Sequence, residues 1–265
     1  MKFDKHSLQA NQHLSNFRSR LQQGLPAHPH SESVIAWLQQ HRSDIKPLLA
    51  DAINIANSVY FDLSVPDQLP IDQVTIFTQR INAQLCKAKA DMGIGRYNEN
   101  RHCYQSNVFR TDVEARTLHI GVDLFLPPMT ILFCPLAATV HSFQNNNNAL
   151  DYGPTIILRH QLSAELVLFS LYGHLSDCSL TTMEVGKPVA AGEAFARVGN
   201  FPGNGNWPPH VHVQLMLDML TMQGDFPGVV TSNDADLWLT LCPNPDLILQ
   251  LPSQRSANTV ILAAV

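Results

Sequence analysis

The sequence predicts a mainly β protein with a helical N-terminal region. From about residue 108 to residue 217, short β-branched or aromatic runs are bounded by proline, glycine and asparagine. Strands this closely spaced favour an antiparallel sheet over a parallel α/β arrangement. From residue 6 to about residue 60, apolar residues instead recur at helical spacing. With 265 residues, of which 45% are hydrophobic and 15% charged, the chain is long and apolar enough to bury a core.

The first elements along the chain are expected to be helices. The stretch "SVIAWLQQHRSDI" has four apolar residues on one helix face, which are Val34, Trp37, Leu38 and Ile45. Asp44 is a candidate cap of a second helix, with Pro47 tolerated in its first turn. Further on, "DQVTIFTQRINAQLCKAKADMG" again has helical periodicity, while "GIGRYNENRHCYQSNVF" is polar and broken by glycine. We expect the whole stretch 61–107 to be a connector that packs against the main domain.

The β-rich part contains six candidate strand regions. They are "TLHIGVDLFL", "TILFCPLAATVHSF", "PTIILRH", "LVLFSLYGHL", "AFARVGN" and "HVHVQLML". The run "NNNN" at 145–148 is expected to form a mobile hairpin loop. The Pro-Asn-Pro sequence in "DADLWLTLCPNPDLIL" argues against a long terminal helix. We therefore divide the chain into a helical N-terminal region with connector, residues 1–107, and a β domain with a turn-rich tail, residues 108–265.

Composition excludes several classes of protein. The net charge of -5 and the absence of a lysine or arginine run predict no nucleic-acid partner. The N-terminus has charges and glutamines where a secretory signal needs about 7 to 15 apolar residues, and no run approaches the roughly 18 needed to span a membrane. The five cysteines are widely spaced, with no CxxC, so reduced thiols are expected. Together these features predict a soluble cytoplasmic protein with no membrane partner.

The segment "WPPHVHVQL" contains a pair of histidines suited to a shared site. Residues two apart in a strand point to the same face, so His210 and His212 would project together while the valines between them enter the core. An HxH pattern alone is a weak signal, because the chain has a second one at His28 and His30. The strand context is what makes the pair at 210 and 212 a candidate site.

A second pair lies in "HIGVDLF", where His119 precedes Asp123 by four residues. Gly121 and the surrounding apolar residues predict a turn that runs into a strand, whose curvature can bring both side chains to one ion. Catalytic zinc usually takes three protein ligands and leaves a fourth position for water. His119, Asp123 and His212 would suffice, with His210 beside the metal. In "LYGHL", His174 ends an apolar strand, where a surface histidine in a turn is the alternative interpretation.

The three motifs in this order resemble a known family. "RTLHIGVDLF", "LYGHL" and "PPHVHVQL" are similar to the HxxxD, HL and HxH signatures of the lysostaphin-type, or LytM-like, zinc metallopeptidases. "MEVGKPVAAGEAFARVGN" also follows the family's glycine rhythm, with Phe195 in place of isoleucine. The resemblance covers about residues 108 to 217. The sequence around "GNWPPH" also resembles that of the metallopeptidase module that some bacterial proteins carry between phosphotransferase and class III aminotransferase domains.

The resemblance implies a LytM-like fold and a role for each matching residue. It implies one zinc ion held by His119, Asp123 and His212, a general base at His210 and a transition-state stabiliser at His174. In this mechanism zinc lowers the pKa of bound water, the base takes the proton, and the hydroxide attacks an amide carbonyl. The expected partner is a peptide or small amide substrate, with cell-wall peptide as one candidate.

Two departures leave an alternative open. Trp207, Pro208 and Pro209 replace the usual Ser-Thr-Gly-rich approach to the HxH motif, and no export signal is apparent. The alternative is a catalytically inactive zinc-bearing module that binds a peptide or small amide.

Other polar residues are assigned ordinary positions. His141 and His160 are expected at strand ends in solvent, and Arg116 at the surface. Tyr152 is expected either to line the groove or to occupy a turn.

Overall fold

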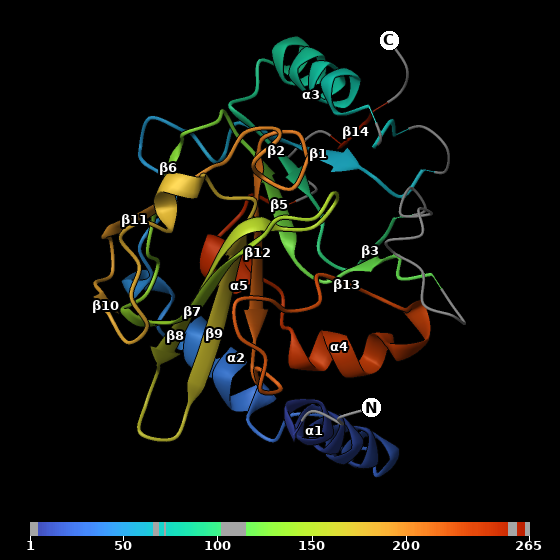
Figure 1. Cartoon of the computed structure of the whole chain (residues 1–265), viewed down its shortest axis with the longest axis vertical. Helices are drawn as coiled ribbons and strands as arrows, with labels where there is room; N and C mark the ends of the chain where they lie inside the picture. The colour runs from blue at the N-terminus through green and yellow to red at the C-terminus, as the bar shows by residue number, and fades with distance from the viewer. Residues whose placement is uncertain (1–4, 66–68, 72, 102–114, 254–258, 263–265) are drawn as a thin grey trace.

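A large mixed β-sheet forms the centre of the molecule (Figure 1). The computed structural model describes residues 5–65, 69–71, 73–101, 115–253 and 259–262. The nine strands of the large sheet, in chain order, are β1 (Ser58–Asp62), β2 (Met92–Gly95), β5 (Val122–Phe125), β7 (Ala138–Asn146), β8 (Gly153–Gln161), β9 (Val167–Gly173), β10 (Pro188–Val189), β12 (His210–Met216) and β14 (Thr259–Ile261). The predicted fold class, mainly β with a helical N-terminal region, is confirmed.

The sheet is antiparallel over most of its width and parallel at one edge. Its strand order is β10-β7-β8-β9-β12-β5-β2-β1-β14. All neighbours from β10 to β2 are antiparallel, as expected, whereas β1 is parallel to both β2 and β14. The parallel pair arises because helix α3 (Val74–Ala88) crosses over from β1 to β2. Residues 58–95 thus form a β-α-β unit, in which the helix was predicted and the two strands were not.

Two smaller sheets accompany the large one among the described residues. One has the order β13-β4-β3 and the other pairs β11 with β6. Their strands are β3 (Glu99–Asn100), β4 (Leu118–His119), β6 (Ile131–Phe133), β11 (Ala194–Arg197) and β13 (Val229–Val230). Because β4 leads directly into β5, the chain passes from the three-stranded sheet into the large one between His119 and Asp123.

The remaining helices lie mainly at the opposite end of the molecule from α3 (Figure 1). They are α1 (Lys5–Gln22), α2 (Ser31–Gln40), α4 (Ala235–Leu241) and α5 (Asp246–Leu249). Helix α1 contacts α4, and α2 contacts α5, so the chain's first helices pack against its last ones. The two helices described in the tail, α4 and α5, are short, in agreement with its Pro-Asn-Pro sequence. Within the described residues, no helix combines the length and apolar character needed to cross a membrane.

The expected second N-terminal helix at Asp44 is wrong. The chain forms a short 3-10 helix, η1 (Arg42–Asp44), and then becomes irregular. Pro47 disfavours helical backbone at Lys46, and the Lys46 amide instead donates to the Pro135 carbonyl at 2.9 Å. The segment after Pro47 is also hydrogen-bonded to the β structure, because the Phe133 amide of β6 donates to the Leu48 carbonyl.

The asparagine run lies partly inside a hairpin. Strand β7 continues through Asn146 before the connection to β8, so 145 and 146 are paired with the next strand. The Asn146 side chain is 5% exposed and donates to the Gly224 carbonyl at 2.9 Å and to Thr155 Oγ1 at 3.1 Å. The hairpin was predicted correctly, but its first two asparagines belong to the strand.

The boundary proposed between residues 107 and 108 lies outside the described residues, as does Cys103. The other four cysteines are free thiols, which are Cys86, Cys134, Cys178 and Cys242.

The apolar side chains form two clusters. The larger lies under the central strands, where Val211, Val213 and Leu215 of β12 are fully buried. The smaller lies between α3 and the neighbouring strands, and contains Phe77 and Phe125. The apolar residues of β12 alternate with polar residues that are also buried but point to the other face, so the strand presents His210 and His212 together.

His160 on β8 is buried, which corrects the expectation of a solvated position. Its ring is 1% exposed; Nδ1 donates to the Ala137 carbonyl at 3.2 Å, and Nε2 accepts from the Ser170 hydroxyl at 2.7 Å. These two contacts use both nitrogens of the neutral ring. Burial lowers the pKa of His160 from 6.5 to about 4, against the opposing effect of its backbone hydrogen bonds.

We expect His160→Gln to make folding stability less dependent on pH. The neutral ring is favoured in the folded state, so its contribution is present above pH 6.5 and is lost as pH falls from about 6.5 towards about 4. The difference between these pKa values corresponds to roughly 3 kcal/mol. The measurement is the free energy of unfolding of both proteins at several pH values between 7 and 4. Parallel curves for the two proteins would contradict the assignment.

Candidate metal centre

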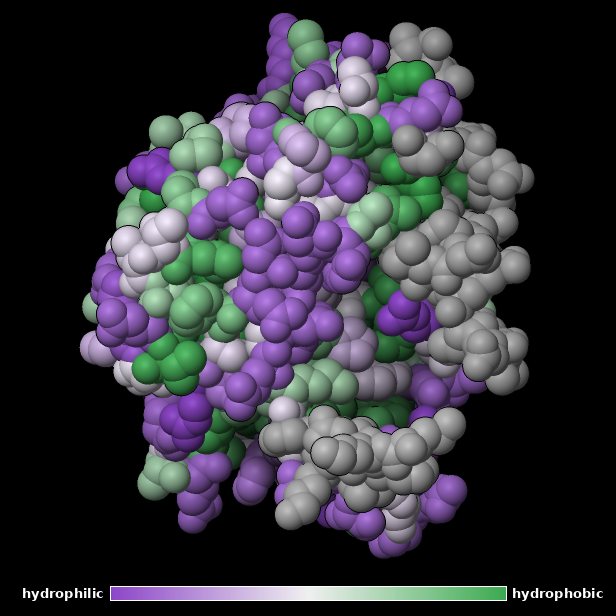
Figure 2. Space-filling view, in the orientation of Figure 1, coloured by the Kyte–Doolittle hydropathy of each residue, from purple (hydrophilic) through white to green (hydrophobic). Residues whose placement is uncertain are grey.

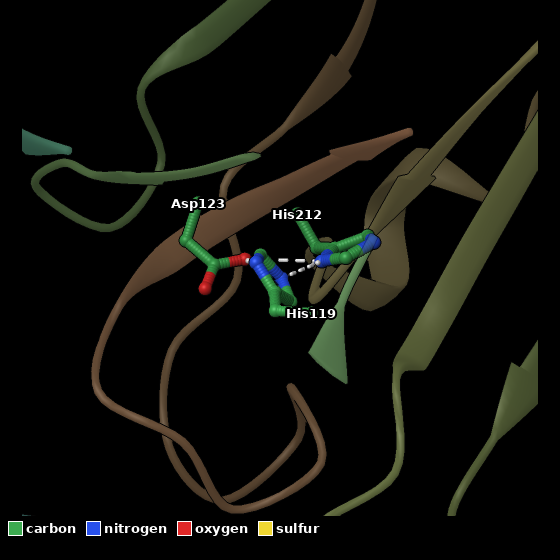
Figure 3. Close-up of side chains that lie close together, drawn as sticks. All are labelled: His119, Asp123 and His212. Atoms are coloured by element: carbon green, nitrogen blue, oxygen red, sulfur yellow. Dashed lines mark hydrogen bonds and ion pairs between the residues drawn. The ribbon is translucent and has the colours of Figure 1, made fainter. Parts of the chain in front are cut away.

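Three buried side chains from separate strands converge on one point (Figure 3). His119 ends β4, Asp123 lies on β5 and His212 lies on β12. The antiparallel register places His212 directly opposite Asp123. All three residues are at most 4% exposed, and within the described part of the chain they form a group whose ligand atoms lie within 4.8 Å of one another.

Gly121 allows this convergence. It lies between β4 and β5, where the chain passes from one sheet to the other. A Cβ atom at this position would collide with the imidazole ring of His212. The HxxxD pattern therefore needs its glycine for the close approach of the facing strand, and not only for the turn.

The three candidate ligand atoms are nearly equidistant. His119 Nε2 lies 3.0 Å from His212 Nδ1 and 3.3 Å from Asp123 Oδ1, and His212 Nδ1 lies 3.0 Å from the same carboxylate oxygen. Ligands about 2.0–2.1 Å from a tetrahedral zinc ion would be about 3.3 Å apart. The donor set and its spacing therefore fit a tetrahedral metal ion such as zinc.

Hydrogen bonds on the far side of each ring determine which nitrogen carries a proton. His119 Nδ1 donates to the Arg96 carbonyl at 2.8 Å, which leaves the lone pair of Nε2 free. His212 Nε2 donates to Gln214 Oε1 at 3.0 Å, and this amide is oriented because its nitrogen donates to the Pro227 carbonyl at 3.0 Å. In the neutral His212 ring, this contact leaves the lone pair of Nδ1 free. Metal-binding histidines are oriented in this way by a partner on the second nitrogen.

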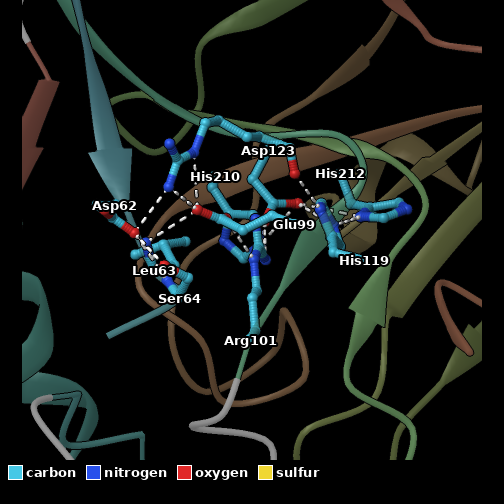
Figure 4. Close-up of polar contacts among 10 residues, drawn as sticks. Asp62, Leu63, Ser64, Glu99, Arg101, His119, Asp123, His210 and His212 are labelled. Carbon is cyan, nitrogen blue, oxygen red and sulfur yellow. Dashed lines mark hydrogen bonds and ion pairs between the residues drawn. The ribbon is translucent and has the colours of Figure 1, made fainter. Parts of the chain in front are cut away.

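Asp123 connects this group to a network of charged side chains (Figure 4). Arg101 Nη1 donates to Asp123 Oδ2 at 2.6 Å, and Arg101 Nε donates to Glu99 Oε2 at 2.9 Å. Glu99 Oε1 accepts from Arg96 Nη2 at 2.6 Å, and the same nitrogen donates to Asp62 Oδ1 at 2.7 Å. Arg101 is 2% exposed and Glu99 is 5% exposed. Arg101 thus occupies one oxygen of Asp123 and leaves the other facing the two histidines.

Burial and neighbouring charges control the protonation of the ligand atoms. Burial alone would raise the pKa of Asp123, but His119 and then Arg101 hold this pKa well below its usual range. Burial lowers the pKa of His119 to about 4, and the positive charge of Arg101 acts in the same direction. The carboxylate is therefore ionised and the His119 ring neutral at pH 7, which are the forms that bind metal ions.

His210 and His174 lie beside the three converging side chains. The His210 and His174 rings are 4.2 Å apart between centroids, and His210 Nε2 is 3.9 Å from Asp123 Oδ1. His210 Nδ1 donates to the Pro208 carbonyl at 2.7 Å, and His174 Nδ1 donates to the Asn204 carbonyl at 2.9 Å. Both rings therefore keep Nε2 available for other partners.

The protonation of these two rings is also set by burial. Burial lowers the pKa of His210, and the nearby Asp123 carboxylate opposes this effect. Burial, and then the neighbouring His210, hold the pKa of His174 well below its usual range. His174 follows β9 with a positive φ of 59°, a backbone conformation that non-glycine residues rarely adopt. It is therefore a buried neutral group in a constrained turn, and not the surface histidine that was the alternative interpretation.

All five predicted site residues line a cavity of about 380 Å³. Tyr152, for which two positions were open, lines the cavity and places its hydroxyl 3.4 Å from His212 Nε2. Trp207 also lines it, so the unusual segment before the HxH motif contributes to the site. Arg116, which was expected at the surface, is a further lining residue.

Sequence analysis missed Arg101 and Glu99. They lie two apart in a polar, glycine-broken stretch that was expected to be a connector. Opposite charges at this spacing can share one face of a strand, which is a signal that could have paired them with each other. Nothing in the local sequence indicates that Arg101 contacts Asp123, because the two residues meet only through the pairing of β2 with β5 and of β3 with β4.

Comparison with protein families matches residues 117–223 to peptidase family M23. No curated protein sequence matches the chain. Among solved structures, the chain is similar to the catalytic domain of the antimicrobial peptidase lysostaphin from Staphylococcus simulans, at 22% identity and a TM-score of 0.33. This match covers 45% of the present chain and 80% of the lysostaphin domain.

Two further structures are similar over nearly the same share of the chain. A zinc-containing peptidase from Vibrio cholerae has 22% identity and a TM-score of 0.31, over 46% of the present chain and 35% of that protein. A variant catalytic domain of the prophage-encoded M23 protein EnpA from Enterococcus faecalis has 22% identity and a TM-score of 0.32, over 45% and 85% respectively. The family match spans the HxxxD, HL and HxH motifs together. Residues 117–223 are therefore the part of this chain that matches peptidase family M23.

Proposed function

We propose that this protein is a zinc-dependent peptidase or amide hydrolase, with His119, Asp123 and His212 as the zinc ligands. The observation that carries the proposal is the convergence of three potential ligand atoms at mutual distances of 3.0–3.3 Å in a buried site. Three lone pairs this close repel one another unless a cation lies between them. When bound, zinc would supply Lewis acidity, which lowers the pKa of a coordinated water and polarises the substrate carbonyl.

We assign His210 as the general base. Its ring is neutral because burial lowers its pKa, and its Nδ1 proton is committed to the Pro208 carbonyl. Nε2 can therefore accept a proton from the attacking water and later return it to the leaving amine. The Pro208 contact fixes the ring direction, which gives the altered segment before the HxH motif a role in orienting the base.

We assign His174 to the developing negative charge of the carbonyl oxygen. Its Nδ1 proton is committed to Asn204, so Nε2 can donate only when the ring carries a second proton. A nearby oxyanion would favour that protonated form, because it supplies the compensating charge inside a buried site. The substrate we propose is a peptide or small amide, and cell-wall peptide belongs to this class.

The wild-type protein should contain about one zinc ion per chain, and His212→Ala should contain little. Removal of one of three protein ligands leaves too few donors to hold the ion tightly. The measurement is elemental analysis after identical purification. His141→Ala is the matched control, since His141 lies on β7 and does not line the cavity, and it should retain the metal. Full zinc content in His212→Ala would contradict the ligand assignment.

His210→Ala should keep its zinc and lose hydrolysis by about 100-fold or more, because a general base contributes roughly 10²–10⁴-fold. The measurement is kcat/KM on a panel of dipeptides, peptide amides and cell-wall peptides, with and without a chelator. Unchanged turnover in the variant would contradict the base role. If zinc-loaded wild type cleaves none of these substrates, the enzyme assignment fails and the protein is a zinc-bearing binding module.

Arg101→Met should lower zinc affinity by about 10- to 100-fold, a loss typical of changes to partners that orient metal ligands. Arg101 holds Asp123 Oδ2 at 2.6 Å, and its loss frees the carboxylate to rotate. Arg101→Lys should recover part of the affinity, because it keeps the charge. The measurement is competition with a chromogenic chelator.

A folding defect can be separated from a metal effect by the double variant Glu99→Gln, Arg101→Met. It removes one of the two carboxylates that the single variant leaves without Arg101, so its thermal stability should recover in part while zinc affinity stays low. Arg159→Met, on β8 and outside the cavity, is the matched control. Wild-type zinc affinity in a folded Arg101→Met protein would show that Asp123 does not depend on this contact.

A further inference from the structure

The cavity has two chemically different walls. One carries the three candidate ligands together with His174 and His210. The other includes eight apolar side chains that belong to, or pack against, the smaller hydrophobic cluster, which are Leu63, Leu69, Ile71, Phe77, Phe125, Leu150, Trp207 and Val229. We call these eight residues the apolar wall. Figure 2 shows apolar side chains gathered below α3 on the right of this face, beside the residues drawn in grey.

The apolar wall is one side of the smaller hydrophobic cluster. Each of the eight residues belongs to that cluster or packs against it, whereas Phe226 and Met222, which also line the cavity, belong to the main core or pack against it. Phe77 from α3 and Phe125 from β5 are buried, whereas Leu69 and Ile71 are only partly buried. The cluster therefore has apolar surface left over, and that surface faces the cavity.

The wall begins next to the proposed base. The Phe125 ring stacks on His210 with 5.1 Å between centroids. The Trp207 ring lies 6.3 Å from His210 and 6.1 Å from His174. A group bound at the histidines would therefore have the apolar wall as its neighbour. Since residues adjoining a scissile amide are a few ångströms from it, a substrate side chain is the group that can reach this surface.

We infer that the apolar wall is a subsite for the aliphatic or aromatic side chain of a residue adjoining the scissile amide. This inference rests on the proposed function and names its substrate class, which is a peptide with a large apolar residue rather than glycine at the cleavage point. A cavity of about 380 Å³ falls within the size range of small-ligand sites. Ligand pockets of this kind combine apolar walls with a few placed polar groups.

The subsite is built largely from outside the family match. Leu63, Leu69, Ile71 and Phe77 all precede residue 117, where the M23 match begins. They come from the segment after β1 and from α3, both of which belong to the β-α-β unit. Substrate choice would thus be set by a part of the chain that the peptidase motifs do not include.

The test compares the binding of leucine hydroxamate and glycine hydroxamate to the zinc-loaded protein by calorimetry. Both probes carry the same metal-binding group and differ in the isobutyl side chain. Wild type should bind the leucine compound at least about tenfold more tightly, as expected for a buried aliphatic side chain. Zinc content is measured in the same samples, so a lost metal is not mistaken for a lost subsite.

Two substitutions at one position alter the wall in opposite ways. Ile71→Ser makes it polar and should reduce the leucine preference to about threefold or less. Ile71→Trp should fill the space and weaken the binding of leucine hydroxamate while leaving the affinity for glycine hydroxamate unchanged. Ile76→Ser is the matched control, because Ile76 is on α3 but 41% exposed and not part of the lining, and it should keep the wild-type ratio.

Equal affinities for the two hydroxamates in wild type, binding of neither, or an unchanged ratio in both Ile71 variants would each overturn the inference. Turnover separates this inference from the proposed function. If the protein prefers leucine hydroxamate in binding but cleaves no peptide, the subsite is supported and the hydrolase assignment is contradicted. If the protein cleaves glycine and leucine peptides at equal kcat/KM, the hydrolase assignment is supported and the subsite is contradicted.

Discussion

The buried carboxylate of Asp123 is the constraint on which the site depends. An ionised carboxylate in the interior is costly unless opposite charge and hydrogen bonds compensate it. Here Arg101 contacts Oδ2, and the two histidine nitrogens lie near Oδ1. Because one oxygen is held on each side, the carboxylate cannot rotate without losing a charged partner. Removing one member of a buried pair typically costs about 3–5 kcal/mol, so this arrangement resists change more strongly than an exposed ion pair would.

This compensation makes the N-terminal part of the chain a component of the site. Arg101 is held by Glu99, and Glu99 in turn accepts from Arg96 and from the amide of Leu63 at 3.0 Å. Strand β2 pairs with β5 so that Gly95 faces Asp123, where a Cβ would lie 2.7 Å from the Arg101 guanidinium. The β-α-β unit therefore supplies, at Gly95, the space in which the Arg101 guanidinium fits, and the segment that follows β2 supplies the charge that balances Asp123.

Sequence patterns predicted the parts of the site whose geometry is local. The alternation in β12 places His210 and His212 on one face, and the glycine in HxxxD marks the turn that brings His119 near Asp123. Contacts between distant strands left no such pattern. Arg101 meets Asp123 only through strand pairing, and the parallel edge depends on a crossover helix whose flanking strands are short. His160 was misplaced for the same reason, since its burial comes from a neighbouring strand and loop and not from its own segment.

The polar and apolar walls of the cavity act on each other through the aromatic rings between them. Phe125 stacks on His210 and also belongs to the smaller hydrophobic cluster. Exclusion of water by this ring contributes to the burial that lowers the pKa of His210 and keeps it neutral. The same ring forms the start of the apolar wall. The surface that would accept a substrate side chain is thus continuous with the surface that keeps the proposed base unprotonated. Packing changes in the smaller hydrophobic cluster would therefore alter both the binding of the side chain and the pKa of His210.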